Sequence, residues 1–220
     1  MKENNTYSID HTSEYIHIRF NRSNKIISSA VLNGGISSVD HILNLKVPLN
    51  VKHNDSPDKT LKDFSNKKGW YGKITGMMTA ASMNTFEIKR QFLDKTEVLI
   101  LVTAGLSNAR RVGDKADYKN EAGTINIIMY TSAILTEAAM IEAVMIITEA
   151  KTAALAELKI TSPISGKIAT GTGTDSVAVI SGQGPDKYNF CGKHVFLGEI
   201  IGKNVLAAVR SSIKKAIKST

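Results

Sequence analysis

The sequence predicts an α+β fold, with mixed α and β elements in a single layered domain whose central sheet of buried strands is flanked by two long helices. Two short, nearly continuous apolar runs, 98–103 and 124–130, are typical of strands buried on both faces. Two long segments, 136–158 and 195–218, have the composition of helices. With 220 residues, 42% of them hydrophobic, the chain is long enough for one sizeable core. We therefore expect residues 1–220 to form one domain.

The N-terminal part is expected to form a β-hairpin behind a polar arm. Residues 15–20 alternate apolar and polar side chains, and residues 25–31 are rich in β-forming residues. Residues 22–24, Arg-Ser-Asn, lie between the two runs and favour a hairpin turn. The arm itself, residues 1–14, is expected to be peripheral.

A lysine-rich segment and a long helix follow. Residues 55–69 are charged, with Pro57 near their start, and are typical of a solvated helix or a surface loop. Further along, Thr136 can cap a helix whose first turn carries Glu137, and the run continues without glycine or proline to about Leu158. We therefore expect one long helix in the middle of the chain.

The C-terminal part is expected to add a strand and the second long helix. Residues 175–180 form a short β-type run. In the second helix Gly198 and Gly202 lie one turn apart, a spacing that lets a helix lie close to its neighbour. The basic tail, residues 210–220, is expected to be peripheral like the arm.

The net charge of +8 is concentrated near the C-terminal end. From Lys193 onward there are six basic residues and one acidic residue, Glu199. Such cations complement the dipole at the end of a helix and keep its surface solvated. Phe196 is the one aromatic residue among them, whereas a platform for single-stranded nucleic acid would need several interleaved aromatic residues. We therefore expect no nucleic-acid partner.

Cysteine usage and hydropathy favour a cytoplasmic protein. Cys191 is the only cysteine, which excludes an internal disulfide and a cysteine-rich metal cage. The polar start has no apolar run behind a basic cap, so we expect no secretory signal. The longest apolar stretches are interrupted by Glu142, Glu149 and Lys151, so we expect no membrane span.

Residues 169–182, ATGTGTDSVAVISG, have the composition of a site loop. Small hydroxyl side chains, glycines and one carboxylate, Asp175, stand in front of a short β-type run. Such a segment turns easily and can aim backbone N–H groups at a ligand or at a developing oxyanion. It lacks the third glycine of a dinucleotide fingerprint and the Gly-Lys-Ser/Thr ending of a phosphate loop. We therefore expect a binding or catalytic loop that is not built for a nucleotide.

Two further polar segments are expected to contact a ligand. Residues 103–114 leave a buried strand and continue with glycine, serine, asparagine and paired arginines, at the strand end where ligands gather in α/β sheets. An arginine beside a short acid can instead hold the loop as a structural pair. Residues 28–35 contain two adjacent glycines, which suggest a tight turn close to a ligand. The candidates from these segments and from the residues behind the turn are Asn108, Arg110, Asp114, His41 and Asn44.

Seven sequence blocks occur in the order found in one enzyme family. They are SSAVLNGG with HILN (28–35 and 41–44), GMMTAASM (76–83), TAGLSNARRVGD (103–114), GTINIIMYTSAILTEAAM (123–140), TEAKTAAL (148–155), SGKIATGTGTDSVAV (165–179) and GKHVFLGEIIG (192–202). On these blocks the chain resembles the adenosylcobinamide amidohydrolases of corrinoid salvage. The resemblance runs from about Ser28 to Val209 and leaves out the N-terminal arm and the basic tail.

The resemblance implies hydrolysis of the secondary amide that joins aminopropanol to the corrin ring of adenosylcobinamide, giving adenosylcobyric acid and 1-aminopropan-2-ol. This corrinoid substrate is cationic and carries no phosphate, so the basic tail is not expected to bind it. No cofactor is known to be required, while a divalent metal and a homo-oligomer stay open. The alternative is a corrinoid-binding protein without catalysis. Within the blocks, the residues expected to bind substrate are Asn33, His41, Asn44, Thr79, Asn108, Arg110, Asp114, Asn126, Thr172 and Ser176.

Amide hydrolysis needs an attacking group, a partner for the oxyanion and a proton donor for the departing amine. The N–H groups and hydroxyls of residues 171–174, among them that of Thr174, are the candidates that stabilise the oxyanion. The candidates for acid and base roles are Asp175, His194 and Glu149, because they are titratable and lie within the blocks. The mechanism we expect first is attack by one activated water molecule.

Two other mechanisms stay open. A hydroxyl nucleophile activated by His194 would form an acyl-enzyme, although the chain has no Gly-x-Ser-x-Gly elbow. A metal ion would make the attacking water a stronger nucleophile. The sequence contains no His-Glu-x-x-His motif and no histidine pair at ligand spacing, so we assign no metal ligand. The candidate nucleophiles are Thr172, Thr174 and Ser176, and the side chains that a metal would use are His194, Glu199, Glu149 and Asp175.

Overall fold

The computed structural model describes residues 6–48, 56–117 and 123–218. Its elements in chain order are β1 (Tyr7–His11), β2 (Tyr15–Ser28), β3 (Gly35–Lys46), α1 (Pro57–Lys67), β4 (Ile74–Thr79), the 3-10 turn η1 (Met83–Thr85), β5 (Glu87–Leu93), β6 (Thr96–Ala104), β7 (Ala109–Arg110), β8 (Ile125–Thr131), β9 (Ile134–Leu135), α2 (Glu137–Glu157), β10 (Gly171–Thr172), β11 (Ser176–Ser181), β12 (Lys187–Tyr188) and α3 (Phe196–Lys218).

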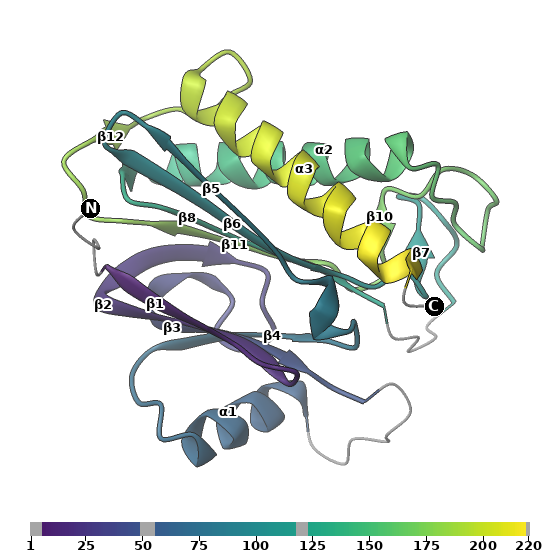
Figure 1. Ribbon diagram of the computed structural model, residues 1–220, viewed down its shortest axis with the longest axis horizontal. Coiled ribbons are helices and arrows are strands. Elements are labelled where there is room, and N and C mark those ends of the chain that lie inside the picture. Colours follow the sequence, from purple (N-terminus) through teal and green to yellow (C-terminus); the bar gives the residue numbers. More distant parts are fainter. Residues whose placement is uncertain (1–5, 49–55, 118–122, 219–220) are drawn as a thin grey trace.

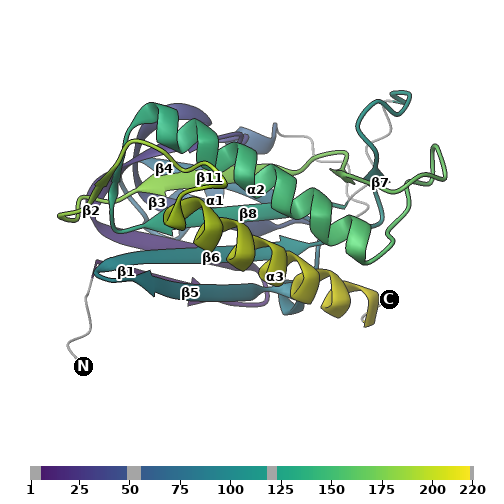
Figure 2. The same ribbon diagram turned by 90° about the horizontal axis from the view of Figure 1, so that it is seen from above.

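These elements are stacked in layers, as Figure 1 shows. Helices α2 and α3 lie over one face of strands β5, β6, β8 and β11, whereas β1 to β4 form a second layer with α1 on its far side. Seen from above, α2 and α3 run side by side along the strands beneath them (Figure 2). The predicted combination of a central sheet and two long helices in a mixed α and β fold is confirmed.

One main sheet connects the two strand layers. Its order is β4-β3-β2-β11-β8-β6-β5, with β1 paired to β2; β3 runs parallel to β4 and β11 parallel to β8, and the other neighbours are antiparallel. The long strand β2 belongs to both layers, because residues 16–20 pair with β1 and residues 25–28 pair with β11. The sheet therefore bends at β2.

The central strands are buried on both faces, as the two apolar runs predict. Along β8, Ile125, Ile127 and Met129 belong to the core under α2 and α3. The alternate residues Ile128 and Tyr130 belong to the core between the two strand layers. Successive side chains of a strand point to opposite faces of the sheet, so the residues of β8 enter the two cores in turn. Because both faces of β8 are covered, most of its residues are apolar.

The predicted N-terminal hairpin at residues 22–24 is wrong. Residues 15–28 form one continuous strand, β2, whose pairing with β3 shifts in register between Arg19 and Asn24. The polar residues form a bulge, and the chain does not reverse its direction there. Phe20 before the bulge and Ile26 after it are both buried, which keeps both parts of the strand in the sheet. The hairpin lies earlier instead, between β1 and β2, where the Thr12 hydroxyl accepts the N–H groups of Glu14 and Tyr15.

The predicted helices are confirmed. The Thr136 hydroxyl accepts the Ala139 N–H at 3.2 Å and caps α2, which ends within one residue of the predicted limit. The described part of the lysine-rich segment is helical, with Pro57 in the first turn of α1. A Cβ on Gly198 of α3 would lie 2.2 Å from the Gly192 carbonyl oxygen, so this glycine allows a close approach of the preceding loop, whereas a Cβ on Gly202 would lie at an ordinary contact distance, 3.5 Å, from Ile146 of α2.

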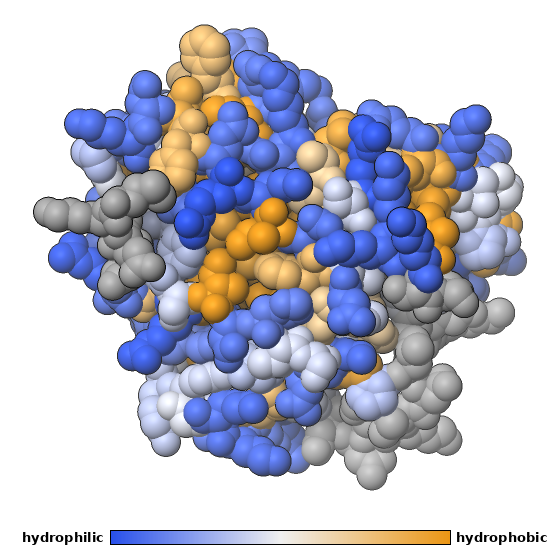
Figure 3. All heavy atoms as spheres, in the orientation of Figure 1, coloured by the Kyte–Doolittle hydropathy of each residue, from blue (hydrophilic) through white to orange (hydrophobic). Residues whose placement is uncertain are grey.

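The described part of the N-terminal arm takes part in the fold. Residues 7–11 form β1, and the Tyr7 hydroxyl donates to Glu97 Oε1 at 2.6 Å across the gap between the layers. Arg90 of β5 lies 2.8 Å from the same carboxylate. Figure 3 shows hydrophobic surface gathered between β5 and β1 on this face, with hydrophilic groups beside it. None of the described helices is long and apolar enough to cross a membrane.

The basic end of the chain is also packed, since α3 continues to Lys218 and Ser212 donates to the Thr85 carbonyl at 2.7 Å.

Replacing the fully buried Ile213 by alanine is therefore expected to lower the free energy of unfolding by about 2–5 kcal/mol. Urea unfolding followed by circular dichroism measures the change. The exposed neighbour Lys214 is the control, since Lys214→Ala is expected to change the free energy by less than about 0.5 kcal/mol. Equal losses in the two variants would show that the tail is not anchored in this way.

Candidate active site

Asp175 is the centre of a buried polar network at the start of β11. The chain turns between β10 and β11 so that the carboxylate faces back to Thr172: Oδ2 accepts the Thr172 N–H at 3.0 Å and Oδ1 accepts the Thr172 hydroxyl at 2.5 Å. Oδ1 also accepts the Ile125 N–H at 3.0 Å, which ties the loop to the start of β8. The loop glycines therefore lead into a turn that is held by its own carboxylate.

Lys151 of α2 is the charged partner of Asp175. Its Nζ lies 2.5 Å from Oδ2, and the side chains of Lys151 and Asp175 are only 9% and 11% exposed. A charge that is removed from water in this way needs an opposite charge and hydrogen bonds. A Cβ on Gly171 would lie 2.3 Å from Asp175 Oδ2 and 2.8 Å from Lys151 Nζ, so the glycine makes room for the pair.

Two threonine hydroxyls meet beside this pair. Thr124, immediately before β8, and Thr174, immediately before Asp175, are in hydrogen-bond contact through their Oγ1 atoms. The Thr174 hydroxyl also donates to the Gly123 carbonyl at 3.2 Å. Thr124 is buried, whereas Thr174 is exposed. The site thus holds a pair of hydroxyls that extends from the surface to the residue just before the central strand β8.

An amide network crosses between the two strand layers next to the hydroxyls. Asn44 of β3 donates to the Thr103 hydroxyl at 2.9 Å and accepts from Asn126 Nδ2 at 2.8 Å. Asn126 Nδ2 also donates to the Met78 carbonyl at 2.9 Å. Within the described part of the chain, Asn126 Oδ1 is buried and has no hydrogen-bond partner. A buried acceptor without a donor is costly, and it marks a position that a ligand N–H group can satisfy.

Thr103, Asn126 and Ser176 stand side by side on three neighbouring strands. Thr103 of β6 is the register partner of Asn126 of β8, which is in turn the partner of Ser176 of β11. The three side chains are buried, and Ser176 Oγ lies 3.4 Å from Ser29 Oγ at the end of β2. The apolar core between the layers therefore ends in a polar border at the same edge of the sheet as Asp175.

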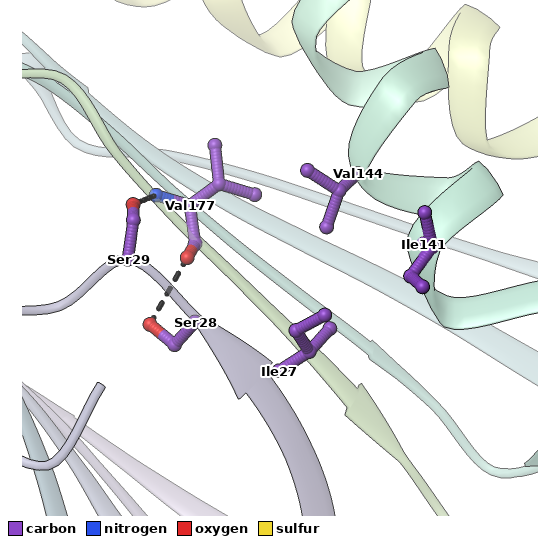
Figure 4. A pocket seen from close by; sticks show the side chains of 6 residues that line it. All are labelled: Ile27, Ser28, Ser29, Ile141, Val144 and Val177. Carbon is purple, nitrogen blue, oxygen red and sulfur yellow. Dashed lines mark hydrogen bonds between the residues drawn. The ribbon is translucent and has the colours of Figure 1, made fainter. Parts of the chain in front are cut away.

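A pocket of about 240 Å³ lies on the other face of this edge, between the sheet and α2. Figure 4 shows Ile141 and Val144 of α2 facing Ile27 and Val177 across it. The serine hydroxyls on its border are engaged, since Ser28 donates to the Val177 carbonyl and Ser29 accepts the Val177 N–H, both at 3.0 Å. This pocket offers an apolar wall and little polar chemistry.

The structure does not bring the predicted acid and base groups together. Glu149 is an exposed residue of α2 and pairs with Lys193 at 2.5 Å. His194 is exposed and borders a pocket of about 510 Å³ with residues of β12 and of the start of α3. In Figure 1, β12 lies at the opposite end of the molecule from β7 and β10. Among the described residues, no hydrogen bond or ion pair joins Asp175 to His194 or Glu149.

The predicted oxyanion donors are largely engaged within the loop. The Thr172 N–H binds Asp175, and the Gly173 N–H donates to the Asn108 carbonyl at 3.0 Å. A Cβ on Gly173 would lie 2.3 Å from Asn108 Nδ2, so close packing, rather than a left-handed backbone, favours glycine here. The hydroxyls of Thr172 and Thr174 are engaged as well, the first with Asp175 and the second with Gly123 and Thr124.

Four of the predicted binding residues have structural partners. Asn33, in the left-handed region at φ +54°, donates to the Ile74 carbonyl at 2.7 Å and shapes the turn between β2 and β3. Arg110 pairs with Asp117 at 3.1 Å, which is the structural pair considered as the alternative. Asp114 accepts the Ser162 hydroxyl at 2.5 Å, and this bond lowers the pKa of its carboxyl. Thr79 accepts the Ala81 N–H at 3.0 Å.

His41 lies away from the Asp175 network, in a buried pair with His17. Because His41 Nε2 lies 3.0 Å from the Tyr71 carbonyl, which can only accept, its ring carries a proton on Nε2. Its Nδ1 then accepts from His17 Nε2 at 3.0 Å. The ring of His17 stacks on Trp70 with 3.7 Å between the ring centroids. Burial, followed by the charge of His41, lowers the pKa of His17 to about 4, and burial also lowers the pKa of His41.

This histidine pair predicts a loss of stability in acid. Unfolded histidine takes up a proton near pH 6.5, whereas folded His17 does so only near pH 4, so the unfolded state gains protons first as the pH falls. The contribution of neutral His17 to the free energy of unfolding is complete above about pH 6.5. As the pH falls from about 6.5 to 4, we expect the free energy of unfolding to decrease by about 2–3 kcal/mol. Urea unfolding at several pH values measures this slope. His17→Phe keeps the stacking on Trp70 but removes the titration, so a slope as steep as in the wild type would contradict the assignment.

Two residues of the network have no place among the predicted site residues. Lys151 follows Glu149 by two positions, and only the fold places it against Asp175. A lysine on the apolar side of a long helix is the signal that could have found it, because such a residue needs a buried acid. Thr124 is the first residue of an apolar run, and a threonine at this position is typical of a buried strand, so the sequence alone does not indicate a site residue. In the ranges that the structure describes, no three His, Cys, Asp or Glu side chains come together as metal ligands.

Comparisons with known proteins identify relatives over almost the whole chain. The family model described as adenosylcobinamide amidohydrolase matches residues 1–220. An uncharacterized protein of Methanocaldococcus jannaschii is 34% identical over 246 residues, covering 96% of this chain and 92% of its own. An adenosylcobinamide amidohydrolase of Methanosarcina mazei is 31% identical over 195 residues, covering 86% and 88%.

Similar solved structures are more distant. A Burkholderia beta-aminopeptidase has a TM-score of 0.49 at 10% identity, covering 94% of this chain and 79% of its own. A Pyrococcus horikoshii protein has a TM-score of 0.44 at 11% identity, covering 96% and 79%.

Proposed function

Because this chain belongs to the adenosylcobinamide amidohydrolase family, we propose that this amide hydrolase cleaves the bond between the corrin ring and aminopropanol in adenosylcobinamide. The products are adenosylcobyric acid and 1-aminopropan-2-ol, and the acid re-enters cobalamin assembly. The observation that carries this proposal is the family match over the complete length of the chain, residues 1–220. The geometry of the Asp175 network supports it.

The network is complementary to a secondary amide. Such an amide presents an N–H donor and a carbonyl acceptor side by side. The unpaired Asn126 Oδ1 can accept the N–H group, and the Thr174 hydroxyl can donate to the carbonyl oxygen in place of Gly123. Donors that are fixed before the reaction stabilise the negative charge that develops on this oxygen. We therefore place the scissile amide at the polar border between the layers.

The ion pair supplies the charges for the reaction. The Lys151 ammonium is the proton source that we assign to the departing amine, since lysine can serve as a general acid. Asp175 already accepts four hydrogen bonds, from Lys151, Ile125 and twice from Thr172. We therefore assign Asp175 a positioning role. It fixes Lys151 and the loop at Thr172 relative to Ile125, the first residue of β8.

The test is the release of aminopropanol. Purified chain is incubated with adenosylcobinamide, and free 1-aminopropan-2-ol and adenosylcobyric acid are measured by mass spectrometry. Equal amounts of the two products are expected, and incubation with adenosylcobyric acid alone is the control that gives no amine. If the corrinoid binds but no product forms, with or without divalent metals, the chain is a corrinoid-binding protein and the proposal is wrong.

A further inference from the structure

The hydroxyls of Thr124 and Thr174 form a path to the peptide bond that precedes Thr124. Thr174 donates to the Gly123 carbonyl oxygen at 3.2 Å, and its Oγ1 also contacts Thr124 Oγ1. A hydroxyl has one proton, so when Thr174 donates to Gly123, Thr124 must donate to Thr174. The proton of the Thr124 hydroxyl is thereby connected, through Thr174, to the carbonyl oxygen of the neighbouring peptide group.

This peptide group is held in place on both sides. A Cβ on Gly123 would lie 2.6 Å from the Asn108 backbone nitrogen, so only glycine fits against that turn. On the C-terminal side of the Gly123–Thr124 peptide bond, the Thr124 carbonyl accepts the Gly105 N–H at 2.9 Å, and the Ile125 N–H donates to Asp175. Because these contacts fix the reacting atoms before any reaction, attack of a hydroxyl on the carbonyl carbon loses little further entropy.

From this geometry we propose that the chain cleaves its own peptide bond between Gly123 and Thr124. Thr124 Oγ1 attacks the Gly123 carbonyl carbon and closes a small ring through its own Cβ, Cα and N. Its proton passes to Thr174 while the Thr174 proton passes to the carbonyl oxygen, which avoids a free oxyanion. The carbon–nitrogen bond then breaks and the nitrogen takes the proton from that oxygen, which leaves an ester between Gly123 and the Thr124 oxygen.

Water completes the reaction. Hydrolysis of the ester gives a carboxylate on Gly123 and restores the Thr124 hydroxyl, now on a residue with a free α-amino group. An N-terminal amine beside a threonine hydroxyl is a pairing that activates the hydroxyl as a nucleophile. If the proposed function holds, Thr124 is then the group that attacks the corrinoid amide, and its acyl-enzyme is an ester. The self-cleavage itself does not depend on that function.

The experiment follows the mass of the full chain. After purification and incubation, the denatured protein is examined by mass spectrometry, and two fragments are expected, 1–123 and 124–220. Thr124→Val is expected to stay whole, and Thr124→Ser, which keeps the hydroxyl, is expected to be cleaved. Thr174→Val is expected to slow cleavage by about 100-fold, the scale for loss of one donor to a developing oxyanion. Thr131→Val, at the far end of β8, is the matched control and should cleave like the wild type.

Two results would overturn the proposal. A folded wild-type chain that stays whole after long incubation excludes self-cleavage, and if that chain releases aminopropanol the proposed function still stands. Cleavage of Thr124→Val at the same bond points to a contaminating protease, and it also excludes the proposal. Conversely, two fragments without aminopropanol release support self-cleavage and contradict the proposed function. Circular dichroism of each variant shows that it is folded, and the cleavage of Thr124→Ser keeps the test valid if Thr124→Val does not fold.

Discussion

Replacing Lys151 by methionine is expected to lower the free energy of unfolding by about 3–5 kcal/mol, the cost of leaving a buried charge without its partner. Methionine keeps the length and packing of the lysine stem but removes the ammonium group that lies 2.5 Å from Asp175. The carboxylate, 11% exposed, would keep only neutral donors. Urea unfolding followed by circular dichroism measures the loss.

The chain offers a matched control for this variant. Lys193 also lies 2.5 Å from a carboxylate, that of Glu149, but the two side chains are 73% and 52% exposed. Water and salt screen such a pair, so Lys193→Met is expected to cost less than about 1 kcal/mol. A loss that is equally small for Lys151→Met would mean that the Asp175 carboxylate is solvated, and the buried network would not exist as described.

Replacing Asp175 by asparagine is expected to lower the rate of amide hydrolysis by about 100-fold or more, a loss typical for removing a group that fixes the donors at a reacting carbonyl. The side chain keeps its size, but one acceptor oxygen becomes an amide NH2 group, which donates and cannot accept. Lys151 or an N–H group of Thr172 or Ile125 then loses its partner. The loop is expected to move relative to the hydroxyl pair of Thr124 and Thr174.

The measurement for this variant is the initial rate of aminopropanol release at saturating and at limiting substrate. A fall in kcat is expected, because the carboxylate acts on the geometry of the reacting groups rather than on the corrin ring. Ser165→Ala, a change in the same polar stretch of sequence outside the network, is the control and should react like the wild type. A change in KM alone would assign Asp175 to substrate binding instead.

Elements with strong local signals could be predicted from the sequence. The Thr136 cap, the absence of glycine and proline over α2 and the apolar run of β8 each depend on residues close together in the chain. The bend in β2 could not be read in this way, because a polar run between two strands is compatible with both a turn and a bulge. Pairing with β3 and with β11, a strand far away in the sequence, decides between them.

The site could be predicted in part for the same reason. The composition of residues 169–182 places a carboxylate in a turn, and the structure shows Asp175 in that position. Its partners Lys151 and Ile125 come from α2 and β8, and such contacts between elements leave no local pattern. His194 lies in a block typical of the family, but being in such a block does not fix where a side chain points.

The most direct test of where catalysis takes place compares two variants in one assay. Asp175→Asn and His194→Ala are incubated with adenosylcobinamide under equal conditions, and the initial rate of aminopropanol release is measured for each. We expect Asp175→Asn to lose about 100-fold or more, and His194→Ala to stay within about threefold of the wild type, because His194 is exposed and outside the network. The opposite result, a large loss in His194→Ala with Asp175→Asn close to wild type, would place the active site at the start of α3 and contradict the site described above.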